Sequence, residues 1–297
     1  MFDLRYHVAS LAAVFLALII GILVGVGISS GGFVKKGERK LLTDQIADLR
    51  NRLSAANARG HDLAQAQQAG ETFIEDTYPA LMAGRLRGLR VALVFVGTID
   101  DGTRSLVERT LSDAGAAAPV RVRALKVPID LGALDAVLAP RPNLAELAVS
   151  TGAGAIGRQL GQEFVAGGPT PLWAALSSQL VAERLGGPKE PADAVVVVRT
   201  AQPQEGDTAR FLAGLYSGLA SQHVPAVGVE TSTALPSAVD AFTRAKLSTV
   251  DDLEAASGRL ALAALLAGAA PGNYGLKDGA KDGLLPPIAP VLAQASG

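Results

Sequence analysis

The chain has 297 residues, with 27 Lys and Arg against 28 Asp and Glu and a formal net charge of −1. This balance leaves no summed positive field, which excludes proteins that hold nucleic acid through its phosphates. Hydrophobic residues make up 49% and charged residues only 19% of the chain, so part of the apolar surface is expected to face lipid. Cysteine is absent, which excludes disulfides, thiolate metal sites and cysteine nucleophiles.

An uncharged apolar segment lies near the N-terminus, from Leu11 to Ile28. With a rise of about 1.5 Å per residue and the preceding Val8–Ser10, it is long enough to cross a hydrocarbon core of roughly 30 Å. It is also longer than the apolar region of a cleaved signal peptide, which has about 7–15 residues. Residues 1–30 are therefore predicted to form a retained transmembrane anchor.

Small residues recur at every fourth position of this anchor, among them Ala17, Gly21 and Gly25. Small side chains let two helix backbones approach closely in a membrane, which predicts self-association of the anchor through this ridge. The alternative is that alanine and glycine are simply frequent here. A strict four-residue row also rotates by about 40° per step, so the whole row does not contact one partner helix.

Residues 31–78 carry an apolar repeat with alternating spacings of four and three residues, which includes Leu42, Ile46, Leu49 and Leu53. A 3.5-residue apolar period with charged flanks predicts a coiled-coil stalk. Isoleucine at an a-type position and leucine at the d-type positions favour a parallel pair, in agreement with a dimeric anchor. The alternative is an amphipathic helix that packs on the chain's own globular domain.

Beyond this stalk, four apolar runs predict strands: Leu89–Val96, Val120–Val127, Ala194–Val198 and Ala226–Glu230. Nearly continuous aliphatic runs are typical of strands covered on both faces, whereas the alternation in Val120–Val127 predicts one more polar face. Helical patterns lie between and after these runs, at 103–114, 131–139, 142–150, 155–166, 172–185, 208–221 and 250–267.

This order of strands and helices predicts a three-layer α/β domain over residues 79–277, with a mostly parallel sheet of about four strands. The last helix is expected to open with a capping signal formed by Ser248, Thr249, Asp251 and Asp252. Residues 278–297 are rich in Gly, Pro and Ala, which predicts a disordered tail.

The sequence offers few residues for catalysis or for metal binding. Residues 152–157 satisfy the spacing G-x-G-x-x-G, but helical patterns on both sides favour a turn between helices over a dinucleotide fingerprint, which follows a strand. Asp100, Asp101 and Glu230 follow two of the predicted strands and could meet at the carboxyl edge of the sheet, although one of the two aspartates is better explained as a helix N-cap. The three histidines show no ligand spacing. No catalytic, cofactor or metal residue is therefore predicted.

Strings at both ends of the chain resemble one family. Leu4–Leu11 and Gly21–Gly25 at the start, and Leu247–Asp252 followed by Gly258, Arg259, Gly272, Tyr274, Gly275 and Lys277, are similar to the mycobacterial copper transport protein MctB family, which includes SteB-type envelope proteins. The similarity extends to about Lys277, and the middle of the chain matches mainly in pattern.

The resemblance implies an actinobacterial envelope protein with an uncleaved N-terminal helix, a coiled coil and an extracytoplasmic α/β domain. It also implies a link to copper homeostasis, as an outer-membrane channel, or a role beside a membrane partner in envelope integrity and division. The positive charges of Lys35, Lys36, Arg39 and Lys40 would by themselves place the domain inside. We follow the family, with a cytoplasmic N-terminus, because long domains are exported largely regardless of such charges.

Two functions follow as expectations. The first is a non-enzymatic scaffold, a parallel homodimer in a lipid bilayer that binds another envelope membrane protein. The second is a copper transport component, for which one predicted membrane helix and few thiol, thioether or imidazole ligands give little support.

Overall fold

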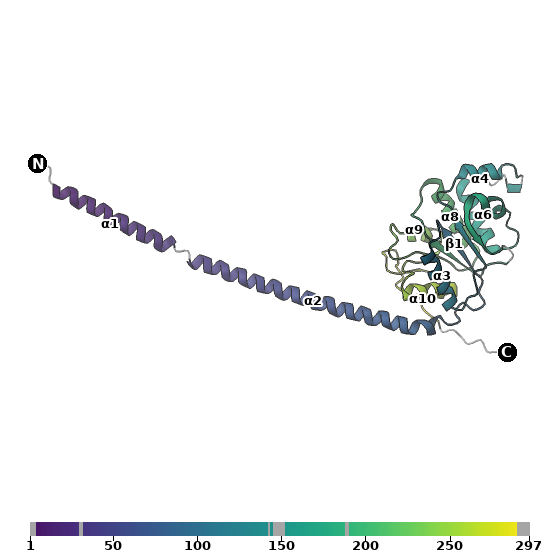
Figure 1. Ribbon diagram of the computed structural model, residues 1–297, viewed down its shortest axis with the longest axis horizontal. Coiled ribbons are helices and arrows are strands. Elements are labelled where there is room, and N and C mark those ends of the chain that lie inside the picture. The colour runs from purple at the N-terminus through teal and green to yellow at the C-terminus, as the bar shows by residue number, and fades with distance from the viewer. Residues whose placement is uncertain (1–3, 30–31, 142, 145–151, 188–189, 290–297) are drawn as a thin grey trace. The chain divides into compact units, whose positions relative to one another are not determined.

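The computed structural model describes residues 4–29, 32–141, 143–144, 152–187 and 190–289 (Figure 1). The chain divides into two compact units, Met1–Ala69 and Gly70–Gly297. In chain order, the elements are α1 (Leu4–Ser29), α2 (Gly32–Met82), β1 (Val91–Val96), α3 (Asp101–Asp113), β2 (Arg121–Leu125), α4 (Leu131–Leu138), α6 (Gly152–Ala166), α7 (Pro171–Leu180), β3 (Val181–Leu185), β4 (Ala194–Arg199), α8 (Gly206–Ala220), β5 (Ala226–Val229), α9 (Val239–Arg244), β6 (Ser248–Val250), α10 (Ala256–Leu266) and β7 (Asn273–Tyr274).

The first unit consists of α1 and most of α2. Within α1, the segment His7–Gly27 is long and apolar enough to cross a membrane, and it is the one such segment among the described residues. Helix α2 runs without interruption through Gly60 and Gly70, and Pro79 lies in its last turn. A single long helix therefore occupies the region where the sequence predicts the stalk.

The second unit confirms the predicted α/β class but contains a larger sheet than expected. Its described residues form a seven-stranded sheet in the order β3-β2-β1-β4-β5-β6-β7, so the prediction of about four strands was wrong. Neighbouring strands are parallel, except that β3 runs antiparallel to β2. The four predicted runs correspond to β1, β2, β4 and β5.

The three additional strands lacked a usable sequence pattern. Strand β3 was included in a predicted helix over 172–185, whereas helix α7 ends at Leu180 and Val181–Leu185 forms an exposed edge strand. Strands β6 and β7 have three and two residues, too short to show a period. The predicted cap at Ser248 was therefore wrong, since α10 begins at Ala256.

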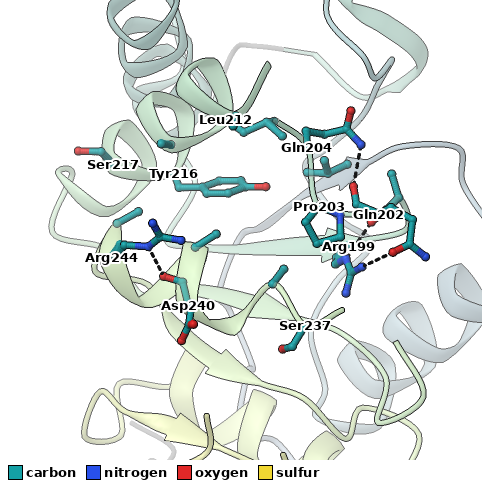
Figure 2. A pocket seen from close by; sticks show the side chains of 17 residues that line it. Arg199, Gln202, Pro203, Gln204, Leu212, Tyr216, Ser217, Ser237, Asp240 and Arg244 are labelled. Atoms are coloured by element: carbon teal, nitrogen blue, oxygen red, sulfur yellow. Dashed lines mark hydrogen bonds between the residues drawn. The ribbon is translucent and has the colours of Figure 1, made fainter. Parts of the chain in front are cut away.

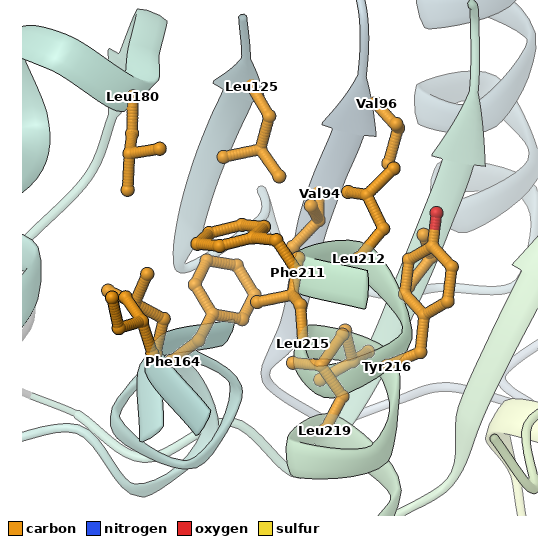
Figure 3. Close-up of a cluster of buried hydrophobic side chains, with 14 of the residues drawn as sticks. Val94, Val96, Leu125, Phe164, Leu180, Phe211, Leu212, Leu215, Tyr216 and Leu219 are labelled. Carbon is orange, nitrogen blue, oxygen red and sulfur yellow. The ribbon is translucent and has the colours of Figure 1, made fainter. Parts of the chain in front are cut away.

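Helices cover both faces of the sheet, and alternate residues of each central strand serve the two layers. Val94 and Val96 of β1 join a cluster with Phe164 of α6 and Phe211 of α8, part of which Figure 3 shows. Leu93 of β1 lies in a second cluster, on the other face, with side chains of α3 and α10. The architecture is thus the predicted three-layer arrangement.

Strand β2 has no polar face, contrary to the expectation from its alternating sequence. All five residues are buried, including Arg121 and Arg123. The Arg121 guanidinium donates to the carbonyl oxygens of Phe164 and Glu190. Arg123 Nη1 donates to the carbonyl oxygen of Leu185 at 2.9 Å. Arg121 is buried because α6 and the segment before β4 cover this face of the sheet, whereas Arg123 also finds a carbonyl partner in the neighbouring strand β3.

Helices α6 and α8 lie against each other through glycines. A Cβ at Gly157 or Gly161 of α6 would overlap the backbone of α8, and a Cβ at Gly214 or Gly218 of α8 would overlap the backbone of α6. The G-x-G-x-x-G string at 152–157 thus forms the first turns of α6, not the predicted turn between helices. Of the predicted helix 142–150, only residues 143 and 144 lie within the described residues.

The segment after Lys277 makes defined contacts where the sequence predicts disorder. Asp282 Oδ2 accepts a hydrogen bond from the Asn273 N–H at 2.7 Å, and Leu285 and Ile288 are half-buried against the core. The described part of this segment ends at residue 289. Residues 290–297 of the predicted disordered tail lie outside the described residues.

Candidate functional site

Asp100 and Asp101 serve the start of helix α3. Asp100 Oδ2 accepts hydrogen bonds from the Thr103 N–H at 2.7 Å and from the Thr103 hydroxyl at 2.8 Å. The bond from the Thr103 N–H lowers the pKa of Asp100. Asp101 lies in the first turn, where a negative charge is favourable. The N-cap interpretation of Asp100 is therefore confirmed.

Glu230 follows β5 and lies at the centre of a buried ionic network. Its carboxylate contacts Arg199 Nη1 at 2.9 Å and Lys277 Nζ at 2.6 Å, and its side chain is 1% exposed. It also accepts hydrogen bonds from the Ala238 N–H at 2.9 Å and from the Ser237 hydroxyl. Burial raises the pKa of Glu230, but these hydrogen bonds outweigh burial and hold the pKa below its ordinary value.

Lys277 reaches this network because Asp251 fixes the backbone after β7. Asp251 Oδ1 accepts from the Leu276 N–H at 2.7 Å and from the Lys277 N–H at 3.2 Å. Gly275 has φ of +138°, and a Cβ there would overlap the Asp251 carboxylate. Asp251 and Gly275, which belong to the sequence segments that carry the family resemblance, therefore position Lys277 beside Glu230.

A cavity of about 410 Å³ adjoins this network (Figure 2). It lies beside the carboxyl ends of β1 and β4, and α8 and α9 form its other walls, with residues such as Val96, Arg199, Leu212, Ser237 and Arg244. From β1 the chain adds β2 and β3 on one side of the sheet, and then β4 on the other. In open α/β sheets, ligands bind at such a reversal of strand order.

Tyr216 of α8 places a polar atom in the cavity. The residue is 6% exposed, and its ring contacts Phe242 at 5.1 Å between centroids. Figure 2 shows its hydroxyl directed toward the loop that carries Gln202 and Pro203. Burial raises the pKa of Tyr216, so the hydroxyl stays protonated and is a hydrogen-bond donor.

The three carboxylates that follow the predicted strands, Asp100, Asp101 and Glu230, have separate roles. Asp100 caps a helix and Glu230 is held in an ion network, and the described residues contain no group of three His, Asp or Glu side chains placed to hold a metal ion. The sequence indicates Glu230 as a candidate and contains Lys277 only within the family resemblance, but it gives no prediction for Arg199 or Tyr216. The available signal for Arg199 was its position directly after the aliphatic run of β4, at the edge where such sheets bind ligands.

The predicted dimer residues lie in the first unit at exposed positions. In α1, Ala17, Gly21 and Gly25 are exposed, and apart from the adjoining turns of α1 itself, no described atom lies within 4 Å of a Cβ placed at either glycine. In α2, the four stalk positions are also exposed, and they are Leu42, Ile46, Leu49 and Leu53. Both series thus remain uncovered by the described part of the chain.

Comparison with known proteins identifies the family. The model of the family described as "Copper transport outer membrane protein, MctB" matches residues 1–285. The chain belongs to this family. Proteins named "Copper transporter MctB" from Mycobacterium bovis and Mycobacterium tuberculosis are 29% identical over 323 aligned residues, which cover 94% of this chain and 98% of each relative. The resemblance found in the sequence is confirmed over nearly the whole chain.

Proposed function

We propose that this member of the MctB family is a non-enzymatic, single-pass envelope protein that works as a parallel dimer and presents its α/β domain to a partner. The observation that carries the proposal is the apolar seam of α2, where Leu42, Ile46, Leu49 and Leu53 are 57%, 48%, 63% and 62% exposed. A second copy of the same helix covers a seam of this period by inserting its own side chains between them.

The anchor supports the same arrangement. Side chains of α1 from His7 to Gly27 are exposed, as expected of a segment that lipid surrounds. The ridge of Ala17, Gly21 and Gly25 allows two copies of α1 to approach closely in the membrane. In the proposed orientation the N-terminus is cytoplasmic and the α/β domain is extracytoplasmic. An outer envelope membrane, which the family description names, is the alternative location.

The family description and the names of the relatives connect them with copper transport. We propose that this chain acts in copper homeostasis or envelope integrity through another membrane protein. The chain has no Cys, 2 Met and 3 His, and its described residues form no metal-binding group. Since copper sites normally use those side chains, a partner is the better candidate for copper conduction. Direct copper transport by this chain is the alternative.

Cysteine crosslinking in native membranes tests the dimer, because the chain has no cysteine of its own. In a parallel coiled coil, Leu49→Cys places two thiols face to face, and oxidation is expected to yield a disulfide-linked dimer. Asn51→Cys, on the outer face of the same helix, is the matched control and should crosslink several-fold less. Equal yields at both positions, or no dimer at Leu49→Cys, would reject the parallel seam.

The copper alternative is tested with purified full-length protein in lipid vesicles. Under the proposed function, vesicles containing the protein alone take up copper no faster than empty vesicles. Copper uptake above that background, by the protein without a partner, would replace the scaffold proposal with the transport component. Pull-down from native membranes, with Leu49→Asp as the dimer-deficient control, would then identify the partner on which the scaffold proposal depends.

A further inference from the structure

The cavity beside β1 and β4 has the size and position of a small-molecule site. Its volume of about 410 Å³ falls in the range of roughly 300–1,000 Å³ that ligand pockets occupy. It lies where the strand order reverses, at the carboxyl edge of a mostly parallel sheet. Neither the copper relationship nor the dimer proposed above requires a cavity at this position.

One end of the cavity carries hydrogen-bond donors. The Tyr216 hydroxyl opens into the cavity, and it makes no hydrogen bond with the other residues drawn in Figure 2. Arg199 donates through Nε to the Ala201 carbonyl at 2.8 Å, through Nη1 to Glu230 at 2.9 Å, and through Nη2 to Gln202 at 3.4 Å. A guanidinium has five N–H groups, so further donors remain for a ligand.

The charge at this end of the cavity is positive. Glu230 carries one negative charge and is shared by two cations, Arg199 and Lys277. Lys277 Nζ also donates to the carbonyl oxygens of Thr231 at 2.8 Å and Ala234 at 2.7 Å, which occupies its three donors. Arg199 is therefore the cation of this network that remains available to the cavity. At α9, Asp240 and Arg244 contribute one charge of each sign.

The remaining wall is largely apolar. Its lining includes Leu212 and Ala213 of α8, Ala241 and Ala245 of the α9 region, and Pro203 in the loop between β4 and α8. This combination favours a ligand with an apolar body and a charged acceptor group at one end.

We propose that this cavity binds a small organic anion, with its apolar body between α8 and α9 and its anionic oxygens at the Arg199 guanidinium and the Tyr216 hydroxyl. A carboxylate and a phosphate ester present the same chemistry, namely oxygens that accept charge-assisted hydrogen bonds. A neutral amide of the same shape lacks the negative charge and is therefore expected to bind more weakly.

Ligand-observed NMR titration of the purified full-length protein tests the proposal with three probes of similar size: 3-phenylpropionate, phenyl phosphate and the neutral 3-phenylpropionamide. For probes of this size, dissociation constants on the order of 1 mM are expected for the bound anions. At least one anion should bind about tenfold more tightly than the amide, because it makes charge-assisted hydrogen bonds. The stronger of the two anions identifies the acid class.

Tyr216→Phe gives the decisive comparison. The hydroxyl makes no hydrogen bond with the other residues drawn in Figure 2, so its removal should leave the melting temperature of the domain nearly unchanged while weakening anion binding about tenfold. Tyr274→Phe is the matched control, because the Tyr274 hydroxyl donates outside the cavity, to Ala270 at 3.2 Å, and anion binding should be unchanged. Ala213→Trp, which fills the cavity from α8, should abolish binding of all three probes.

Equal affinity for 3-phenylpropionate, phenyl phosphate and the amide would overturn the proposal. So would unchanged anion binding in Tyr216→Phe, or no binding of either anion at 10-fold the expected dissociation constant of about 1 mM. Dimer crosslinking at position 49 is independent of these outcomes, so failure of this proposal does not decide the proposed function.

Discussion

Two glycine ridges with the same four-residue spacing have opposite surroundings in this protein. In α6, a Cβ at Gly157 or Gly161 would overlap the backbone of α8. In α1, apart from the adjoining turns of the same helix, no described atom lies within 4 Å of a Cβ at Gly21 or Gly25. The α/β domain therefore uses its ridge to join two of its own helices, whereas the ridge of α1 remains available to a second chain.

Ion pairs also differ between the two regions: the α/β domain buries its ion network within the chain, whereas α2 exposes its ion pair to water. Glu230 is 1% exposed and is held by two cations. On α2, the ion pair between Arg52 and Asp48 has side chains that are 77% and 58% exposed. Burial makes removal of Glu230 costly, because it leaves two buried cations around a lost charge. The exposed pair is screened by water and contributes little.

Glu230→Gln is expected to have the largest effect. The substitution leaves Arg199 and Lys277 without their anion, and breaking a buried pair typically costs about 3–5 kcal/mol. Denaturant unfolding of the domain, followed by circular dichroism, measures the loss. Lys277→Met should cost less, since Glu230 keeps Arg199. A loss below about 1 kcal/mol for Glu230→Gln would contradict the assignment of this network.

The stability lost in Glu230→Gln is expected to depend on pH. The folded-state pKa of Glu230 is lowered, so its contribution is fully present above the unfolded-state pKa of about 4.3 and is lost as pH falls toward the folded value. The difference in unfolding free energy between the unmodified protein and Glu230→Gln should therefore shrink below about pH 4.3. Unfolding titrations from pH 7 to pH 3 measure it, and a difference that grows with acidity would be inconsistent.

The glycine ridge of the domain is the next target. Gly161→Ala places a methyl group against the α8 backbone, which cannot move aside as a side chain can, and should destabilise the domain by about 2–3 kcal/mol. Gly154→Ala is the matched control in α6, because its methyl group would lie 3.4 Å from the Arg210 carbonyl oxygen. It should change stability by less than about 1 kcal/mol. Similar losses at both positions would show that close helix contact is not the cause.

The ridge of the anchor should respond in the opposite manner. Gly21→Ile combined with Gly25→Ile keeps two α1 helices apart, so disulfide formation by Leu49→Cys should fall several-fold while the melting temperature of the domain stays unchanged. Ala12→Ile, which adds the same side chain on the opposite face of α1, should leave crosslinking intact. An equal decrease in both variants would show that the ridge of small residues does not form the proposed dimer contact.

The smallest effect is expected at the exposed pair of α2. Asp48→Asn removes an i,i+4 ion pair with Arg52, and should reduce the helical stability of the stalk by no more than about 0.5 kcal/mol. Thermal melting of the stalk at low and high salt measures the change, which should vanish at high salt. A loss as large as that of Glu230→Gln would contradict the weak contribution expected of an exposed pair.

Much of the fold was predictable because its signals are local. The aliphatic runs of β1 and β4 identify central strands, and the length of the apolar segment in α1 identifies a membrane-spanning candidate. Strand β3 was not predictable, because Glu183 and Arg184 read as an exposed continuation of α7 and become a strand only by pairing with β2. Burial of Arg121 was not predictable either, because its partners, Phe164 of α6 and Glu190, lie 43 and 69 residues away in the sequence.

The candidate site was predictable only in part. Glu230 stood out as a carboxylate after a strand, and Asp100 as a cap, since each follows a strong local pattern. Tyr216 belongs to a helical stretch, where an aromatic residue is expected to be core, and nothing local indicates that its hydroxyl faces a cavity. Lys277 lies 47 residues from Glu230, a distance across which sequence periodicity carries no information.

By itself, the amino-acid sequence determined the apolar N-terminal helix, the 3.5-residue apolar repeat of α2, the α/β class and the absence of thiol chemistry, because composition and short-range period decide these. The tertiary structure alone decided which glycine ridge is covered within the chain and which is open. It also decided that Arg199, Glu230 and Lys277 meet beside the cavity. Contacts of this kind depend on how separate strands and helices are brought together in space, and each residue's neighbours along the chain leave that undetermined.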